Sequence, residues 1–263
     1  MEHSSRYIVL FAAAVCGVCS IFVAVSAVAL KDRQERNKKI DVQSKVLVLA
    51  GLLDEDADVS PDQVERLFSE RIVPRVVDLE TGAYLDDVDG SGLDPKALAA
   101  DPKTSHEAPP NPAKVRRIPE YTVVYQVMSD DGQLREVILP VQGKGLWSTL
   151  YGFIAIGADG NTIEGITFYE HGETPGLGGE VDNPRWKALW KGRKAFDPNG
   201  RVAIHVKKGR AGPPQSDPYA VDGLSGATMT SRGVSNLLAF WLGEQGFGRY
   251  LEHFRTEMSG GRA

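Results

Sequence analysis

The residues from Tyr7 to Leu30 form a stretch without a charged side chain, and this stretch constrains the fold more than any other feature. A helix needs about 20 apolar residues to cross the hydrocarbon core of a bilayer. The stretch therefore predicts one transmembrane helix over residues 7–30, with residues 1–6 on one side and all later residues on the other. Val25-Ser26-Ala27 leaves a cleaved signal peptide open, but the length favours an uncleaved anchor.

Both cysteines, Cys16 and Cys19, lie inside this stretch. The rest of the chain therefore has no thiol for a disulfide or a metal site, and its folding depends on its apolar core. A redox pair or a metal site within the membrane is the alternative for the two thiols, but packing as small apolar side chains is favoured.

The charges beside the span favour a cytoplasmic location for the carboxyl-terminal part. Arg6 is the only Lys or Arg before the span, whereas a run of Lys and Arg follows it from Lys31 to Lys39. Positive charge concentrates on the cytoplasmic side of such helices. Interleaved acidic residues such as Asp32 and Glu35 weaken this bias, and large domains translocate despite flanking charge.

Two helical segments are predicted after the span. Residues 40–53 carry an apolar pattern and continue the anchor, and Ser60-Pro61-Asp62-Gln63 is a capping box that starts another helix. Residues 86–112 are poor in large apolar side chains and predict an exposed loop. Asp87-Val-Asp-Gly-Ser-Gly92 begins like a calcium loop, but Leu98 stands in place of the terminal Glu, so no metal site is expected.

From Tyr121 the pattern changes to short β-type runs separated by tight turns such as Asp131-Gly132. The expected strands are 121–127, 136–141, 151–157, 162–169 and 202–207, with helices at 184–190 and after Ser231. Strands paired by tight turns, with helices grouped elsewhere, predict an α+β fold: an antiparallel sheet with packed helices. We expect a helical connector and loop-rich lobe over residues 31–118 and the domain that carries the chemistry over residues 119–263.

The net charge is −5, and acidic and basic residues are mixed along the chain. This pattern argues against nucleic acid as a partner. No Gly-x-Gly-x-x-Gly stands between a predicted strand and a helix, so the chain is not expected to bind a dinucleotide.

Hydroxyl groups and small residues concentrate in residues 222–231, Asp-Gly-Leu-Ser-Gly-Ala-Thr-Met-Thr-Ser. A helical face follows, with Thr230 or Ser231 expected to cap its first turn, formed by Val234, Leu237, Leu238, Trp241 and Leu242. The start of a helix suits a phosphate, and Gly223, Gly226 and Ala227 would let it approach the main chain. Neither a nucleophile elbow nor a phosphate-binding loop is complete here, and an ordinary loop and cap is the alternative.

A second polar cluster, residues 171–179, follows the expected strand 162–169. Its glycines and Pro175 predict a sharp loop that presents Glu173 and Thr174 and can wrap a planar ligand. His171-x-Glu173 also fits zinc deaminases, but their Pro-Cys-x-x-Cys partner is absent. An ordinary turn is the alternative.

Asp222-Gly-Leu-Ser225-Gly-Ala-Thr228 resembles the flavinylation motif Asp-x-x-Ser/Thr-Gly/Ser-Ala-Thr/Ser, whose last hydroxyl residue carries FMN through a phosphodiester bond. Together with the 171–178 loop and Trp186, it is similar to the FMN-binding domain shared by the C subunit of the sodium-translocating NADH:quinone reductase and the G subunit of the Rnf complex. The segments 143–147 and 151–155 match the same family. The reductase family is favoured over the Rnf family by residues 45–52, by residues 75–79 and by the long segment before the first strand.

The resemblance implies that FMN is bound covalently to Thr228, which serves as an attachment point and not as a catalytic residue. A separate flavin transferase would attach the FMN and recognise Asp222 and the residues after it. The implied cofactor-binding residues are Asp222, Ser225, Gly226, Ala227 and Thr228 in the motif, Leu146 and Trp147 near the isoalloxazine ring, and Glu173, Thr174, Leu177 and Gly178 along its other edge.

The resemblance also implies an electron-carrying subunit, inactive alone, of a bacterial inner-membrane complex that couples NADH oxidation and ubiquinone reduction to sodium export. Its partners would be the other subunits of that complex. Its single anchor would leave the soluble domain in the periplasm, against the charge count. A subunit of the Rnf ferredoxin:NAD oxidoreductase complex, or a membrane-anchored flavin-binding sensor or assembly module without turnover, are the alternatives.

Overall fold

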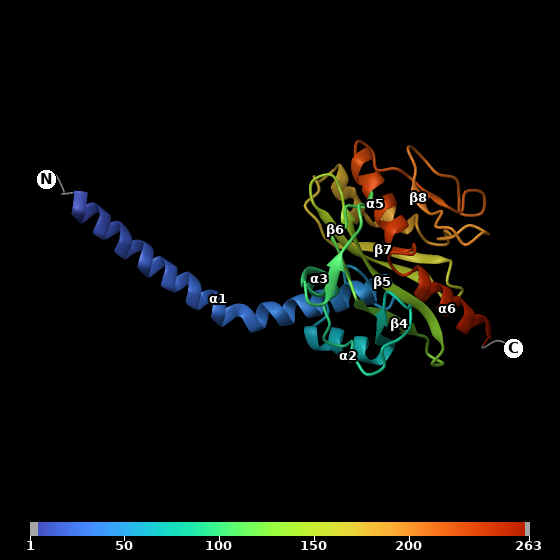
Figure 1. Cartoon of the computed structure of the whole chain (residues 1–263), viewed down its shortest axis with the longest axis horizontal. Helices are drawn as coiled ribbons and strands as arrows, with labels where there is room; N and C mark the ends of the chain where they lie inside the picture. The colour runs from blue at the N-terminus through green and yellow to red at the C-terminus, as the bar shows by residue number, and fades with distance from the viewer. Residues whose placement is uncertain (1–4, 261–263) are drawn as a thin grey trace. The chain divides into compact units, whose positions relative to one another are not determined.

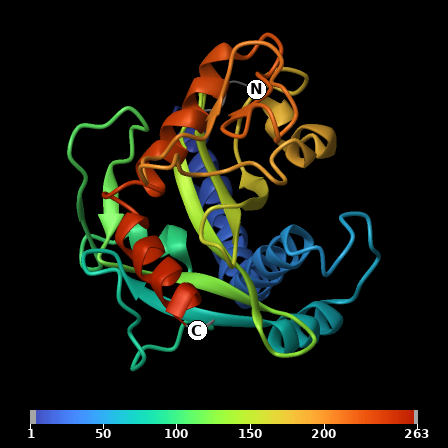
Figure 2. The ribbon, with the colours of Figure 1, turned by 90° about the vertical axis from the view of Figure 1, so that its right-hand side faces the viewer.

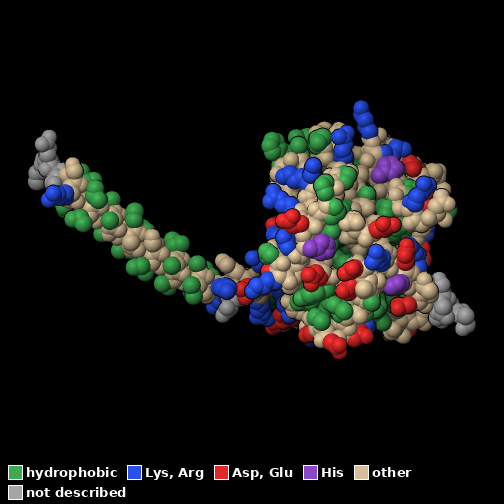
Figure 3. All heavy atoms as spheres, in the orientation of Figure 1, with side chains coloured by type: hydrophobic (Ala, Val, Ile, Leu, Met, Phe, Trp, Pro, Cys, Tyr) green, Lys and Arg blue, Asp and Glu red, His purple; other side chains and the backbone are tan. Residues whose placement is uncertain are grey.

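The structure is a computed structural model that describes residues 5–260. It contains two compact units, one up to Gln43 and one from Ser44 onward. The first unit consists of most of α1 (Ser5–Leu49), in which Ser5–Lys31 is the one described helix long and apolar enough to cross a membrane. Hydrophobic side chains are exposed along this part, and Lys and Arg side chains appear only at its ends (Figure 3). The position of this helix agrees with the predicted span over residues 7–30.

Helix α1 continues without a break beyond the span, as the pattern of residues 40–53 predicts, but it ends earlier, at Leu49. The backbone turns at Gly51, which has a φ of 64°. Within the second unit, Val46 and Leu47 are fully buried. The end of α1 is therefore part of the core of the second unit.

Helix α2 (Pro61–Arg71) begins with the predicted capping box. The backbone N–H of Ser60 donates to Oε1 of Gln63 at 2.8 Å, and the Ser60 hydroxyl accepts from the backbone N–H of Gln63 at 3.4 Å. These reciprocal bonds satisfy donors that the helix leaves without a partner at its start.

The second unit is built on an antiparallel sheet of five strands in the order β1-β4-β5-β6-β7 (Figure 1). The strands are β1 (Ile72–Asp78), β4 (Tyr121–Met128), β5 (Leu134–Lys144), β6 (Thr149–Gly157) and β7 (Ile163–Glu170). The sheet confirms the predicted α+β fold. Strand β1 was not predicted, because Pro74 and Arg75 interrupt its apolar pattern. It pairs with β4, so the segment 31–118 contributes an edge strand to the sheet.

Shorter elements surround this sheet. They are α3 (Pro95–Ala100), β2 (Ser105–Glu107), β3 (Arg117–Pro119), the 3₁₀ turn η1 (Gly178–Asp182), α4 (Pro184–Ala188), β8 (His205–Val206), β9 (Ala220–Val221), α5 (Thr228–Trp241) and α6 (Gly248–Gly260).

Two expectations from the sequence were wrong. Residues 86–112 are not all exposed loop, because α3 buries Leu98 and Ala99. The expected strand 202–207 shrinks to β8, which pairs in parallel with β9 and not with the main sheet.

Helix α5 packs against β5 at close range (Figure 2). The predicted apolar face of α5 is buried at all five positions, Val234, Leu237, Leu238, Trp241 and Leu242. Two glycines, Gly143 on β5 and Gly233 on α5, lie in this contact. A Cβ on Gly143 would lie 2.5 Å from Cβ of Leu237, and one on Gly233 would lie 2.4 Å from the carbonyl oxygen of Lys144. The absence of these two Cβ atoms allows α5 to lie close to β5, and this packing fixes the position of the helix start.

We expect Gly233→Ala to destabilise the protein even though alanine favours a helix by about 1 kcal/mol over glycine. Its methyl group would meet the Lys144 carbonyl oxygen at 2.4 Å, and overpacking of this kind costs roughly 1–3 kcal/mol. Urea unfolding of the detergent-solubilised chain measures the change. Arg232→Ala, at the neighbouring exposed position, is the matched control and should leave the midpoint unchanged. A higher midpoint in Gly233→Ala would contradict the close contact.

Candidate functional site

Thr228 is the first residue of α5, and its side chain is exposed. Among the described residues, none forms a hydrogen bond with its hydroxyl, and none accepts from the backbone N–H groups of Thr228, Met229 or Thr230. The N-cap residue is Ala227, which has no side chain to cap the helix. An exposed hydroxyl thus lies beside free N–H groups at the positive end of a helix dipole, an arrangement that suits a phosphate.

The predicted cap at Thr230 or Ser231 was wrong. The helix begins before both residues, and both side chains point into the protein and are buried. The Ser231 hydroxyl accepts from the backbone N–H of Leu224 at 3.0 Å and so fixes the loop that leads into the helix. Gly226 completes the turn with a φ of 70°, a conformation that favours glycine.

Glu173 connects three segments: its own loop, the loop between β5 and β6, and the first turn of α5. Its carboxylate accepts from the backbone N–H groups of Leu146, Trp147 and Ser148, at 3.2, 2.9 and 3.1 Å. It also accepts from the Thr230 hydroxyl at 2.6 Å. The side chain is nearly fully buried. Glu173 therefore holds the loop between β5 and β6 against the first turn of α5.

Burial by itself raises the pKa of the Glu173 carboxyl. The hydrogen bonds from Thr230 and from the three backbone N–H groups favour the ionised form and outweigh burial, so the pKa lies below its ordinary value. Glu173 is thus a carboxylate at neutral pH, and all its bonds are directed at the protein. It positions the loop and does not offer a free group to a ligand.

Four large apolar side chains remain exposed around this network. Leu146 is 44% exposed, Trp147 67%, Leu177 44% and Met229 51%. Leu177 lies next to the motif, because a Cβ on Gly226 would approach its Cδ2 to 2.9 Å. Clusters of exposed apolar side chains mark binding surfaces in soluble domains. We call these four residues the apolar rim; they suit a planar ligand attached nearby.

The other predicted residues differ in their surroundings. Asp222 is half-buried, and its Oδ1 accepts from the N–H of Ala211 at 2.8 Å. Its backbone carbonyl accepts from the indole N–H of Trp186 at 2.9 Å. Thr174 has an exposed side chain, and its carbonyl closes the turn by accepting from Leu177 and Gly179.

Ser225 and Gly226 are exposed beside Thr228, whereas Ala227 and Gly178 are buried. Gly178 packs on the carboxylate network, because a Cβ there would lie 2.6 Å from Oγ1 of Thr230. The structure thus brings the motif, the 171–178 loop and the 146–148 loop together. The residues that the sequence did not assign to the site are Ser148, Met229 and Thr230. The only sequence feature that points to these three residues is that each lies within two positions of a residue that was assigned to the site.

We expect Glu173→Gln to lower the free energy of unfolding by about 2 kcal/mol at neutral pH, since an amide nitrogen would face N–H and O–H donors. The sign of the pH dependence follows from the lowered pKa. The carboxylate stabilises the fold fully above the ordinary Glu pKa of about 4.3, and this stabilisation is lost as the pH falls through the folded-state value. Urea titrations of both proteins from neutral to acid pH should show that the difference in their free energies of unfolding becomes smaller. We call this difference the gap. A gap that does not change with pH would contradict an ionised Glu173.

Comparisons with known proteins agree with this geometry. Residues 145–243 match the FMN-binding domain family, and this range contains the apolar rim, Glu173 and Thr228. The chain is 48% identical over 257 residues to the C subunit of the Na(+)-translocating NADH-quinone reductase of Pseudomonas aeruginosa, covering 97% of each chain. It is 46% identical to the C subunit of the same enzyme in Yersinia pestis, covering 91% of this chain and 89% of that one.

The fold is also that of a solved relative. The crystal structure of Shewanella oneidensis NqrC matches with a TM-score of 0.76 at 35% identity, over 85% of this chain and 99% of that one. The full-length relatives are C subunits of the reductase, the family that residues 45–52 and 75–79 favour over the Rnf family. The chain is therefore a membrane-anchored protein that belongs to the family of C subunits of the Na(+)-translocating NADH-quinone reductases.

Proposed function

We propose that this chain carries FMN bound through its phosphate to the Thr228 hydroxyl. The observation that carries the proposal is an exposed hydroxyl at a helix start, where neither the hydroxyl nor the first three N–H groups have a partner among residues 5–260. A phosphodiester at this position would accept hydrogen bonds from those N–H groups. The exposed Ser225 and Gly226 leave room for the phosphate, and the match to the FMN-binding domain supports FMN as the cofactor.

The isoalloxazine ring would then pack on the apolar rim, with Leu146 and Trp147 on one side and Leu177 on the other. Glu173 would act through the 146–148 loop that it holds, not by touching the ring, since its oxygens are already bonded. Thr174 and Gly178 would contribute by shaping the turn. The bound flavin supplies electron-transfer chemistry, and the chain supplies its position and surroundings.

In the assembled complex, this chain would serve as an electron carrier between NADH oxidation and quinone reduction, and the complex would couple that reaction to sodium export. The names of the relatives support this role. The other subunits would bind NADH, because this chain has no dinucleotide-binding motif. They would also conduct sodium, since a single anchor helix without an ionisable residue in its core cannot form a pathway.

The attachment is tested with Thr228 variants of the complex, produced together with a flavin transferase. In a denaturing gel, wild-type protein and Thr228→Ser should fluoresce under ultraviolet light, because either hydroxyl residue completes the motif. Thr228→Ala should not. Membranes that contain the Thr228→Ala complex should also show a smaller flavin absorbance change on addition of NADH.

Arg232→Ala is the matched control, since its side chain is exposed on the same helix and belongs to neither the motif nor the apolar rim. Fluorescence that persists in Thr228→Ala would move the attachment to another residue. An NADH response that is identical in wild type and Thr228→Ala would instead favour a flavin-binding sensor or assembly module without turnover.

We propose further that α1 lies in the bacterial inner membrane and that the soluble unit lies in the periplasm. Lys and Arg after the span argue for the opposite orientation, but the interleaved acidic residues and the large domain weaken that bias. The family resemblance supports the periplasm. Flavin transfer to Thr228 by a transferase that recognises Asp222 would then take place outside the cytoplasm.

Reporter fusions after Ala263 test the orientation. Alkaline phosphatase should be active and green fluorescent protein should be dark, because the first folds only in the periplasm and the second fluoresces only in the cytoplasm. The reverse pattern would place the flavin on the cytoplasmic side and would exclude an electron path across the membrane to this FMN.

A further inference from the structure

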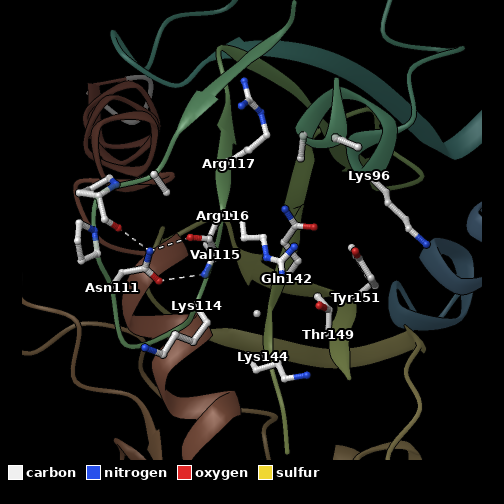
Figure 4. A pocket seen from close by; sticks show the side chains of 16 residues that line it. Lys96, Asn111, Lys114, Val115, Arg116, Arg117, Gln142, Lys144, Thr149 and Tyr151 are labelled. Carbon is white, nitrogen blue, oxygen red and sulfur yellow. Dashed lines mark hydrogen bonds between the residues drawn. The ribbon is translucent and has the colours of Figure 1, made fainter. Parts of the chain in front are cut away.

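A hollow lined by five cationic side chains lies between α3, the loop of residues 108–116 and the strands β5 and β6 (Figure 4). Its volume is about 800 Å³. The cations are Lys96, Lys114, Arg116, Arg117 and Lys144, and none of the residues that line the hollow is acidic. We call it the basic pocket. In a chain with a net charge of −5, such a concentration of one sign creates a local field that attracts anions.

Four of these five cations form no ion pair with any residue of the described chain. Lys96 pairs with Glu170 at 2.6 Å, but Arg117 is held by the Ser105 hydroxyl at 2.8 Å, and Lys144 donates to the carbonyl of Trp147 at 2.7 Å. Within residues 5–260, the side chains of Lys114 and Arg116 have neither a hydrogen bond nor an ion pair. Both residues are exposed, and both line the hollow (Figure 4).

The loop that presents Lys114 and Arg116 is held in a fixed shape. The Asn111 amide donates to the carbonyls of Pro109 and Val115 at 2.8 and 2.9 Å, and its oxygen accepts from the N–H of Val115 at 3.0 Å. Ala113 is fully buried, and its backbone carbonyl accepts from the backbone N–H of Lys144 at 2.8 Å.

Lys114 itself has a φ of 54°, and it is the only non-glycine residue with a positive φ in the described chain. A left-handed backbone is costly for lysine and free of cost for glycine. Strain of this kind persists where the surrounding structure fixes it, and it is concentrated at functional sites. The pocket is therefore organised in advance of any ligand.

We propose that the basic pocket binds a phosphate-bearing ligand, distinct from the FMN on Thr228. Arginine binds phosphate oxygens through two parallel N–H groups, and lysine binds them as a point charge. The small apolar walls at Ala99, Ala108 and Pro109 leave space for an organic part, and the volume is in the usual range for small-molecule sites.

The pocket is a site separate from the motif. Asn236 of α5 donates to the Pro112 carbonyl at 3.1 Å, so the 108–116 loop meets α5 eight residues after Thr228, about 12 Å along the helix. The source of the phosphate is either a soluble phosphate ester or the headgroup of an anionic lipid.

The first test titrates inorganic pyrophosphate into the full-length chain, held in nanodiscs of neutral phosphatidylcholine, by calorimetry. Lys114→Gly/Arg116→Ser should weaken binding by roughly tenfold or more, since each lost charge-assisted contact is worth about that factor. Lys114→Gly also removes the strained backbone, so the unfolding midpoint should stay or rise, which separates loss of binding from loss of fold. Arg185→Ser/Lys191→Ser removes the same charge from exposed positions outside the pocket and should bind as wild type does.

The second test distinguishes a soluble phosphate ester from a lipid headgroup as the source of the phosphate. Amine acetylation is followed by mass spectrometry at Lys114 and Lys144, with Lys191 and Lys208 as internal controls. Protection of the pocket lysines by pyrophosphate in neutral nanodiscs assigns a soluble ligand. Protection without pyrophosphate in nanodiscs that contain phosphatidylglycerol assigns a lipid headgroup. Protection in neither case overturns the proposal, and so does binding of hexaglutamate without binding of pyrophosphate, which would make the pocket a docking surface for an acidic protein segment.

Discussion

The buried carboxylate of Glu173 is the interaction on which the site depends. It satisfies three consecutive backbone N–H groups of the 146–148 loop and the hydroxyl of Thr230 on α5. A buried carboxylate is stable only when hydrogen bonds satisfy its oxygens. Such bonds also fix the geometry of the groups that they join. One side chain therefore sets the distance between the apolar rim and the start of the helix that carries Thr228.

The close packing of α5 on β5 complements this interaction. Gly143 and Gly233 let the helix approach the sheet, so the strands define where the helix begins. Thr230 and Ser231 are used inside the protein, and Ala227 offers no cap. Within the described chain, the first turn of α5 is thus left with free N–H groups beside the Thr228 hydroxyl, where an attached phosphate could use them.

The basic pocket and the proposed flavin site share a structural element and no lining residue. Lys144 lines the pocket and holds the carbonyl of Trp147, whose N–H is bonded to Glu173. The loop that supports the apolar rim is therefore fixed from both sides. An anion that draws Lys144 toward the pocket would loosen one of these two supports. This connection gives the pocket a direct physical route to the surroundings of the flavin.

Features that depend on neighbouring residues can be predicted from the sequence. Four such features are the uncharged run 7–30, the capping box at Ser60, the apolar face of α5 and the order of residues in 222–228. Other features exist only in the folded chain. Glu173 acts on a partner 57 positions away, and β1 pairs with β4. Thr230 and Ser231 face inward, and five cations from separate segments line one hollow. Such arrangements depend on which distant backbone groups meet, and no local pattern encodes that.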